Sequence, residues 1–357
     1  MLQNGHQEVD FLTAMLQDIS IVGATCMHIA SGQYNKVNFE FDYVIMDESS
    51  KASPPETLVP INMGRNIVLI GDHKQLPPVI TKDKNLKNKI DEALSDNGLG
   101  ANKDFGKSLF ETLIEAFEEN PKQQEYIKML DIQYRMPAQI GALISKYFYD
   151  NKLKNAPPAL LKDKTHGLSL KKETSIVFIN TSNRSNPSDN GNKTNRNNPC
   201  NVKAVAELLE QLNELYSTNL EQEKPLSIAV IAGYRGQVKL LRKEIETNKY
   251  ENFAALIDID TVDKFQGAER DIIIYDVVRS SEKAQDVIGF LEDYRRINVA
   301  FSRVKRLLFV VGDKDYLLNR AILHPQSDFK DFKLQQIVEE LDQAGLVYDN
   351  FSELLDK

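Results

Sequence analysis

Two adjacent carboxylates, Asp47 and Glu48, directly follow the apolar run Tyr43–Met46. In open α/β sheets, ligands bind at the carboxyl ends of the parallel strands. An aspartate there can hold Mg²⁺, which prefers oxygen ligands, and a second acid beside it can activate an attacking water molecule. Because a turn after a strand is often acidic by chance, the pair predicts a catalytic site only if other residues support it.

A second polar group follows the next apolar run, in the stretch GDHKQLPPVI, residues 71–80. Asp72 again falls at the end of a predicted strand, and Gln75 follows within reach of the same edge. A neutral amide there can orient a water molecule or contact a terminal phosphate, as glutamine does in several nucleotide hydrolases. A turn ended by proline explains Pro77 and Pro78, but it does not explain Gln75.

Two further stretches carry residues that suit a nucleotide. In DIQYRMP, Arg135 offers a planar guanidinium for phosphate oxygens and Tyr134 offers an aromatic face for a base. In TVDKFQGAERD, which lies between two predicted strands, Gly267 permits a ligand to approach the backbone closely and is flanked by Gln266 and Glu269.

The segment RRINVAFSRVKR, Arg295–Arg306, contains four arginines and one lysine. Ile297, Ala300 and Phe301 have helical spacing, so we expect a helix with Arg303 on a face different from that of the apolar residues. A charged surface helix would explain this segment as well as a binding site would.

Short apolar runs alternate with longer stretches of helical period, which predicts an α/β fold with parallel sheets. We expect helices over Lys107–Glu119 and Val202–Tyr216. The polar segment Thr181–Asn201 is expected to be a long loop, either mobile or ordered by a ligand, and the mobile surface loop is favoured. Strands are expected over Ile19–Thr25, Tyr43–Met46, Asn66–Asp72, Tyr126–Ile132, Ser175–Thr181, Ser227–Gly233, Ala255–Thr261, Asp271–Val278 and Arg306–Asp313.

The whole chain has 357 residues, which suggests two domains, and a net charge of −8. An acidic protein that binds nucleic acid must do so through a local basic strip. No apolar run is long enough to span a membrane, and no secretory signal is evident, so we expect a cytoplasmic protein. Cys26 and Cys200 match no metal-binding spacing and are expected to be reduced thiols.

Taken together and in this order, the motifs are far more specific than any one of them. The chain resembles superfamily I helicases, in the subgroup of the nonsense-mediated-decay helicase and senataxin. The matching stretches lie between Tyr43 and Lys305 and cover most of the chain: VIMDESS, GDHKQLPP, QYRMP, GYRGQV, TVDKFQGAERD and RRINVAFSRVK.

The resemblance implies two RecA-like P-loop NTPase domains, over residues 1–122 and 123–357, that use ATP and Mg²⁺ and move along single-stranded nucleic acid. The first domain is expected to be incomplete at its N-terminus. The implied catalytic residues are Glu48 as general base, Gln75 as γ-phosphate sensor, and Arg135 and Arg303 as arginine fingers. The implied cofactor contacts are Asp47, which would also hold Mg²⁺, Tyr134, Gln266, Gly267 and Glu269. The implied nucleic-acid contacts are Thr25, Pro77, Arg235, Thr261 and Lys264.

The sequence departs from the family in two places. Ser50 stands where the family usually has glutamine, so the coupling between ATP and the strand is expected to differ. The phosphate-binding motif G-x-x-x-x-G-K-[ST] is missing before Asp47. The stretch ANKDFGKS, Ala101–Ser108, is similar but begins with alanine, follows the acid pair and has no strand before it. We therefore expect a missing N-terminal part of the helicase that carries this loop, and negligible ATP hydrolysis by this chain alone.

Two functions of different classes remain open. The first is a fragment of an ATP-dependent helicase or translocase. The second is a nucleic-acid-binding or scaffold module that is derived from a helicase and does not hydrolyse ATP. An unrelated P-loop kinase or small GTPase does not account for QYRMP or for RRINVAFSRVK.

Overall fold

The computed structural model describes residues 14–16, 18–30, 39–78, 107–161, 164–192, 195–218, 226–247, 250 and 257–355. The chain divides into two compact units, Met1–Lys128 and Met129–Lys357. The predicted domain bounds, 1–122 and 123–357, stay a prediction. Both cysteines are free thiols. No helix among the described residues is long and apolar enough to cross a membrane.

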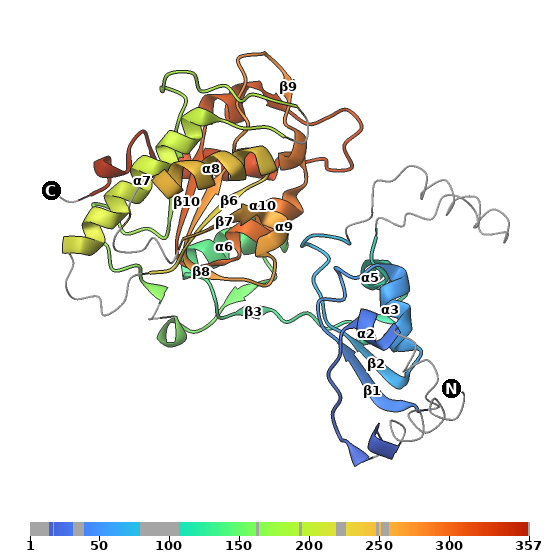
Figure 1. Ribbon diagram of the computed structural model, residues 1–357. Helices are drawn as coiled ribbons and strands as arrows, with labels where there is room; N and C mark the ends of the chain where they lie inside the picture. Colours follow the sequence, from blue (N-terminus) through green and yellow to red (C-terminus); the bar gives the residue numbers. More distant parts are fainter. Residues whose placement is uncertain are drawn as a thin grey trace, which may run out of the picture. The chain divides into compact units, whose positions relative to one another are not determined.

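Unit 1 contains a pair of parallel strands, β1 (Phe41–Met46) and β2 (Gly64–Leu69), with Tyr43 opposite Asn66 and Met46 opposite Leu69. Figure 1 shows the helices that lie beside this pair: α2 (Cys26–Ala30), α3 (Pro54–Ile61) and α5 (Leu109–Glu118). Helix α3 begins with a capping box, in which Glu56 accepts hydrogen bonds from the backbone N–H and the hydroxyl of Ser53.

The strand predicted over Ile19–Thr25 is wrong. These residues form an extended coil before α2, and none of them pairs with a strand in the described part of the chain. A buried strand needs apolar side chains and also a neighbouring strand that pairs with its backbone. An apolar run supplies only the side chains. Ile21 accordingly stays 87% exposed.

Unit 2 is built on a six-stranded sheet with the order β12-β5-β10-β8-β6-β7, in which every pairing is parallel. Its strands are β5 (Ile176–Asn180), β6 (Ile228–Ala232), β7 (Ile257–Thr261), β8 (Arg270–Asp276), β10 (Val304–Gly312) and β12 (Val347–Tyr348). All residues of β5 and β6 are buried, as expected for parallel strands covered on both faces.

Helices cover the two faces of this sheet (Figure 1). Helices α7 (Pro199–Thr218) and α8 (Arg235–Thr247) pack on the face that carries Val230 and Ile274. On the opposite face, Tyr275 packs edge-on against Phe301 of α10 (Tyr294–Phe301). Helix α10 also contacts α6 (Ala138–Phe148), α9 (Val262–Phe265) and α11 (Lys333–Gln343). The predicted α/β fold with a parallel sheet is confirmed, as are the helices predicted over Lys107–Glu119 and Val202–Tyr216 and the helix predicted in the basic segment.

The strand predicted over Tyr126–Ile132 is largely wrong. Only its last residue is in a strand, β3 (Ile132–Gln133), which pairs with β4 (Lys154–Asn155). The preceding residues form a short 3-10 helix, Gln124–Tyr126, and a coil in which Leu130 is 81% exposed. The apolar residues of this run therefore do not mark a buried strand.

The polar loop Thr181–Asn201 is held in place where the structure describes it. Asp189 pairs with Arg279 and Arg196 through opposite carboxylate oxygens, at 2.5 Å in each case. The amide of Asn198 donates to the carbonyl oxygens of Pro187 and Val278. These internal ion pairs and hydrogen bonds argue against the favoured interpretation of a mobile surface loop for the described residues.

Short elements complete unit 2. They are the parallel pair β9 (Asp286–Val287) and β11 (Ala321–Ile322), the 3-10 helices Pro158–Leu160, Gly289–Glu292 and Phe351–Glu353, and a π-helix at Tyr316–Arg320.

Candidate functional site

The acid pair lies in a tight turn at the carboxyl end of β1. The backbone N–H of Glu48 donates to Oδ1 of Asp47 at 2.9 Å, and both side chains are exposed. Glu48 has a φ of 52°, in the left-handed region that non-glycine residues seldom adopt. Such strain persists only where the surroundings enforce it, and it is common at functional sites.

A set of close contacts joins this turn to the GDHKQLPP loop that follows β2. The backbone N–H and the hydroxyl of Ser49 both donate to the carbonyl oxygen of Ile70, at 2.9 and 2.7 Å. A Cβ atom at Gly71 would lie 2.8 Å from the backbone nitrogen of Ser50, so only glycine fits here without displacement. The two carboxyl ends therefore bring the acid pair and the second motif to one edge, as the sequence predicts.

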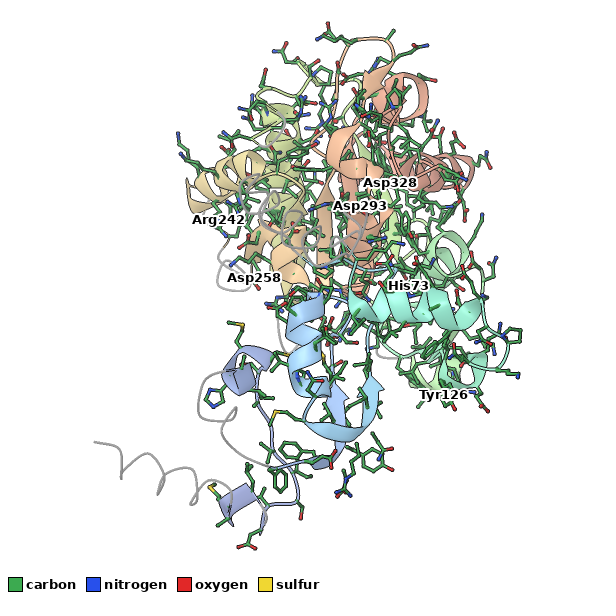
Figure 2. The ribbon with its side chains drawn as sticks, turned by 90° about the vertical axis from the view of Figure 1, so that its right-hand side faces the viewer. His73, Tyr126, Arg242, Asp258, Asp293 and Asp328 are labelled. Carbon is green, nitrogen blue, oxygen red and sulfur yellow. The ribbon has the colours of Figure 1, made fainter. Side chains whose placement is uncertain are left out.

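The carboxylate of Asp72 organises the second loop. Its Oδ1 accepts from the backbone N–H of Lys74 at 3.0 Å, and its Oδ2 accepts from Nε2 of Gln75 at 2.7 Å. Burial, followed by the charge of Lys74, lowers the pKa of His73. His73, labelled in Figure 2, is therefore held more neutral than a solvent-exposed histidine.

The two nucleic-acid contacts expected in unit 1 lie on separate loops. Thr25 is exposed and precedes α2, where its hydroxyl accepts from the backbone N–H of His28 at 3.2 Å. Pro77 is partly exposed and follows the buried Leu76. No hydrogen bond in the described part of unit 1 joins these two loops.

The glycine-lysine-serine stretch near residue 106 forms no phosphate loop in its described residues. Ser108 is the N-cap of α5, and its hydroxyl accepts from the backbone N–H of Glu111. Nζ of Lys107 pairs with Glu115 at 2.7 Å. Residues 101–106 lie outside the described residues.

In unit 2, Arg135 and Glu269 come together although 134 positions separate them in the sequence. Nε of Arg135 donates to Oε2 of Glu269 at 2.8 Å, and a terminal nitrogen donates to the carbonyl oxygen of Ser302 at 3.3 Å. Partial burial raises the pKa of Glu269, but the hydrogen bond and charge of Arg135 and the charge of Lys305 outweigh it, and the pKa lies below its ordinary value.

Arg303 is buried, with 4% of its surface exposed. Its Nε donates to the carbonyl oxygen of Val299, and a terminal nitrogen donates to the hydroxyl of Ser302, both at 3.2 Å. The alternative of a solvated charge on a surface helix is therefore wrong for Arg303. Its guanidinium binds the backbone at the C-terminal end of α10.

The remaining predicted nucleotide contacts lie near the start of β8 or on the loop before α6. Tyr134 is 56% exposed, which leaves its ring accessible. Gly267 has a φ of 84° and open space where a Cβ atom would stand. Glycine is therefore favoured here by the left-handed backbone conformation and not by a lack of space. Gln266 ends α9 and is partly buried.

Three of the five predicted nucleic-acid residues, Arg235, Thr261 and Lys264, line one surface cavity of about 670 Å³. We call it the basic groove. Its other lining residues, which sequence analysis missed, are Val238, Lys239, Arg242, Lys243 and Asp260. Figure 2 labels Arg242 on α8 at the surface of unit 2.

The cations of the basic groove repeat along one face of α8. Positions 235, 239, 242 and 243 follow the i, i+4, i+7, i+8 spacing that places side chains on the same side of a helix. Arg242 pairs with Asp260 at 2.9 Å and donates to the carbonyl oxygen of Ile259, which ties α8 to β7. Five cations and one carboxylate give the groove a strong positive potential within an acidic chain. The spacing was visible in the sequence and could have revealed the groove.

Two family models, each described as an AAA domain, match residues 2–83 and 105–315. The second match alone covers more than half of the chain. This chain belongs to the AAA-domain helicases. Its relatives place it with superfamily I helicases of the nonsense-mediated-decay and senataxin subgroup, which confirms the resemblance and the RecA-like fold class. The helicase sen1 of Schizosaccharomyces pombe is 29% identical over 87% of this chain and 17% of its own length. The regulator of nonsense transcripts 1 of Dictyostelium discoideum is 30% identical over 87% and 22%.

An uncharacterised ATP-dependent helicase of Methanocaldococcus jannaschii is 30% identical over 86% of this helicase chain and 41% of its own length. The chain thus spans less than half the length of these relatives. Among solved structures, the arterivirus nonstructural protein 10 helicase has 14% identity and a TM-score of 0.33 over 77% of this chain and 40% of its own. That score is too low to carry any argument about the site.

Proposed function

We propose that this helicase chain forms part of an ATP-driven motor that moves along single-stranded nucleic acid. The observation that carries the proposal is the basic groove, because residues expected to contact nucleic acid from separate motifs converge there with three further cations. Lysine and arginine side chains that neutralise phosphates provide most of the sequence-independent affinity for nucleic acid. Among the residues that the structure describes, the groove has no aromatic lining residue, which supports backbone contact rather than base stacking.

The acid turn of unit 1 is the proposed site of hydrolysis. No group of three His, Cys, Asp or Glu side chains in the described residues could hold a metal ion by itself. The exposed carboxylate of Asp47 suits Mg²⁺ bound mainly by phosphates and water, the usual arrangement for this ion. Bound Mg²⁺ would neutralise charge on the phosphates. Glu48 takes a proton from the attacking water, and Gln75, steered by Asp72, orients that water against the terminal phosphate.

Unit 2 supplies the proposed cationic groups. Arg135 and Arg303 stabilise the charge that spreads over the phosphoryl oxygens in the transition state. Tyr134 lies against the adenine, and Gln266, Gly267 and Glu269 lie near the phosphates and ribose. Since Arg135 pairs with Glu269 in this structure, the arginine exchanges one anionic partner for another when nucleotide enters.

A partner segment that carries the phosphate-cradling loop is part of the proposal. One face of the β1–β2 pair exposes Tyr43 and Ile45 from β1 and Val68 from β2, with exposed fractions of 66%, 67% and 42%. Parallel sheets are normally covered on both faces, so this face suits a further layer of the same domain. A cytoplasmic location also stays within the proposal.

The test is the binding of fluorescent single-stranded DNA and RNA to the 357-residue chain at several salt concentrations. Replacing both Lys239 and Lys243 by alanine should remove two phosphate contacts and lower the slope of log affinity against log salt by about 1.4. The matched control replaces the exposed Lys152 and Lys330, which lie outside the groove. An unchanged slope in the groove variant, or an equal loss in the control, would remove the groove from the proposal.

A second function, nucleic-acid binding without hydrolysis, would use the basic groove alone. The two functions differ in one measurement. A polypeptide that carries the phosphate-cradling loop, added to the chain, should restore ATP hydrolysis stimulated by single strands if the motor is correct. Strand binding without hydrolysis in that mixture would support the second function.

A further inference from the structure

The side chain of Gln133 uses all of its hydrogen-bonding capacity inside unit 2. Its Oε1 accepts from the backbone N–H groups of Arg135 and Met136, at 2.9 and 2.7 Å. Its Nε2 donates to the carbonyl oxygen of Met136 at 3.0 Å and to Oδ1 of Asn155 at 2.7 Å. Two acceptor sites and two donor hydrogens are the whole capacity of a glutamine amide. With 8% of its surface exposed, Gln133 spends this capacity on the turn that follows it.

The surrounding structure fixes which way this amide points. Gln133 lies opposite Asn155 in the β3–β4 pair, and Nδ2 of Asn155 donates to the carbonyl oxygen of Ala138 at 2.9 Å. Oδ1 of Asn155 therefore faces Gln133 and requires a donor there. Gly141 of α6 lets the helix approach, since a Cβ atom would lie 2.0 Å from that Oδ1.

We propose that Gln133 is a positioning residue that holds the Tyr134–Pro137 turn so that Arg135 is directed at its anionic partners. This deepens the proposed function and rests on it for the role of Arg135. The backbone of Arg135 is fixed by Gln133, and its guanidinium is fixed by Glu269 and the carbonyl oxygen of Ser302. The same turn leaves the Tyr134 ring exposed.

This arrangement makes Arg135 preorganised. An arginine side chain has many rotamers, and a contact that must be ordered during the reaction stabilises the transition state less. A turn held at two backbone N–H groups removes the backbone part of this cost before nucleotide enters. Gln133 thus acts through Arg135, although it is not itself placed to touch a ligand.

The test measures hydrogen exchange by NMR in the whole 357-residue chain. Gln133→Met keeps the length and removes the hydrogen bonds. We expect the Arg135 and Met136 amides to exchange about 100-fold faster and the Arg135 Nε–H signal to broaden, while amides of β6 keep their protection. The control is Gln139→Met, since Oε1 of Gln139 also accepts two hydrogen bonds, from Thr174 and Ser175, away from the turn.

Gln133→Glu keeps the acceptor but places a second oxygen against Asn155 Oδ1 and the Met136 carbonyl oxygen. At about pH 5 the added carboxyl can carry a proton and donate again. The protection factor of the Arg135 Nε–H, which corrects for the slower intrinsic exchange at lower pH, should therefore partly recover relative to about pH 7.5. Gln133→Met offers no such recovery. This series decides the matter even if Gln133→Met fails to fold. Wild-type protection of the Arg135 Nε–H in a folded Gln133→Met chain, or a protection factor in Gln133→Glu that is the same at both pH values, would overturn the proposal.

Hydrolysis is measured separately, with the P-loop segment supplied. Gln133→Met should lower kcat by about 100-fold and leave KM for ATP within about threefold, as for an interaction made only in the transition state. If Arg135→Ala leaves hydrolysis unchanged, the proposed function fails, and the exchange data still decide the role of Gln133.

Discussion

The hydroxyl of Ser50 accepts a hydrogen bond from the backbone N–H of Asp72 at 3.1 Å. Ser50 is 2% exposed, so this contact joins the turn of the acid pair to the following loop from inside unit 1. The short side chain of Ser50 thus holds the two loops together directly.

We expect Gly71→Ala to separate these loops. The added Cβ atom would lie 2.8 Å from the backbone nitrogen of Ser50 and 3.0 Å from Oγ of Ser49. Such overpacking should lower the free energy of unfolding of unit 1 by about 1–3 kcal/mol, measured by urea titration. Gly23→Ala is the matched control, because no atom lies within 4 Å of its Cβ position. Equal stability of the two variants would contradict the close packing described at Gly71.

Glu48 should show opposite effects on stability and on turnover. Its φ of 52° costs a non-glycine residue about 1–2 kcal/mol, so Glu48→Gly should raise the stability of unit 1 by about 0.5–1 kcal/mol. The same change removes the proposed base and should abolish ATP hydrolysis in the complemented helicase, as should Glu48→Gln with ATP binding kept. Asp150→Gly, at the same φ in unit 2, should stabilise without loss of hydrolysis. Hydrolysis at the parental rate by Glu48→Gln would refute the assignment of the base.

The two arginines should behave as a unit in hydrolysis. In the complemented helicase, Arg135→Ala and Arg303→Ala should each lower turnover by about 10²-fold. The double variant should raise the activation free energy by much less than the sum of the two single increases. The salt dependence of strand binding should not change. Arg306→Ala is the control, because Arg306 lies in the same basic segment and binds Asp271 and the Thr165 carbonyl oxygen. Full turnover in Arg303→Ala would exclude it from the active site.

The pH dependence of stability should carry the signature of Asp276. Burial raises its pKa to about 6, against hydrogen bonds from Asn201, Gln237 and the backbone N–H of Val278 that favour the charged form. A raised native pKa means that protonation favours the folded state, and this stability is lost as pH rises through about 6. When the pH is lowered from 7.5 to 4.5, the free energy of unfolding of the wild type should rise by about 2 kcal/mol relative to that of Asp276→Asn, measured by chemical unfolding. The exposed Asp328 (Figure 2) replaced by asparagine serves as control and should follow the wild type. Parallel curves for wild type and Asp276→Asn would contradict a buried titrating carboxyl.

The strands that the sequence predicts best are those whose environment is uniform. Ile176–Asn180, apart from its final asparagine, and Ile228–Ala232 are apolar and form interior strands of a covered parallel sheet, so composition alone identifies them. Ile19–Thr25 has a similar composition but no pairing neighbour in the described structure. Pairing is a long-range property, and a local apolar run does not contain it.

The candidate site divides in the same way. The placement of Asp47, Glu48, Asp72 and Gln75 at one edge could be predicted because they follow the ends of two strands within a few residues. Gln133 was missed, since its importance lies in hydrogen bonds to the turn after it and to Asn155, which no spacing rule describes. The meeting of α8 with Asp260 and Thr261 likewise requires the folded sheet, although the cationic repeat on α8 could be read from sequence.

The connection from β7 to β8 is short for a parallel crossover. Through β6, Thr261 lies level with Asp276, so the chain must return about 20 Å along the sheet and about 10 Å across it to begin β8 at Arg270. Parallel crossovers usually need a dozen or more residues, whereas this one is Val262–Glu269. Helix α9 contributes about 6 Å of rise, and it is followed by a turn in which the N–H of Ala268 donates to the carbonyl oxygen of Phe265 at 3.1 Å. This segment links the basic groove at one end to the Glu269–Arg135 pair at the other. A strand that pulls Thr261 or Lys264 by a few ångströms should therefore act first on this turn, which stands between the groove and Glu269 in the chain.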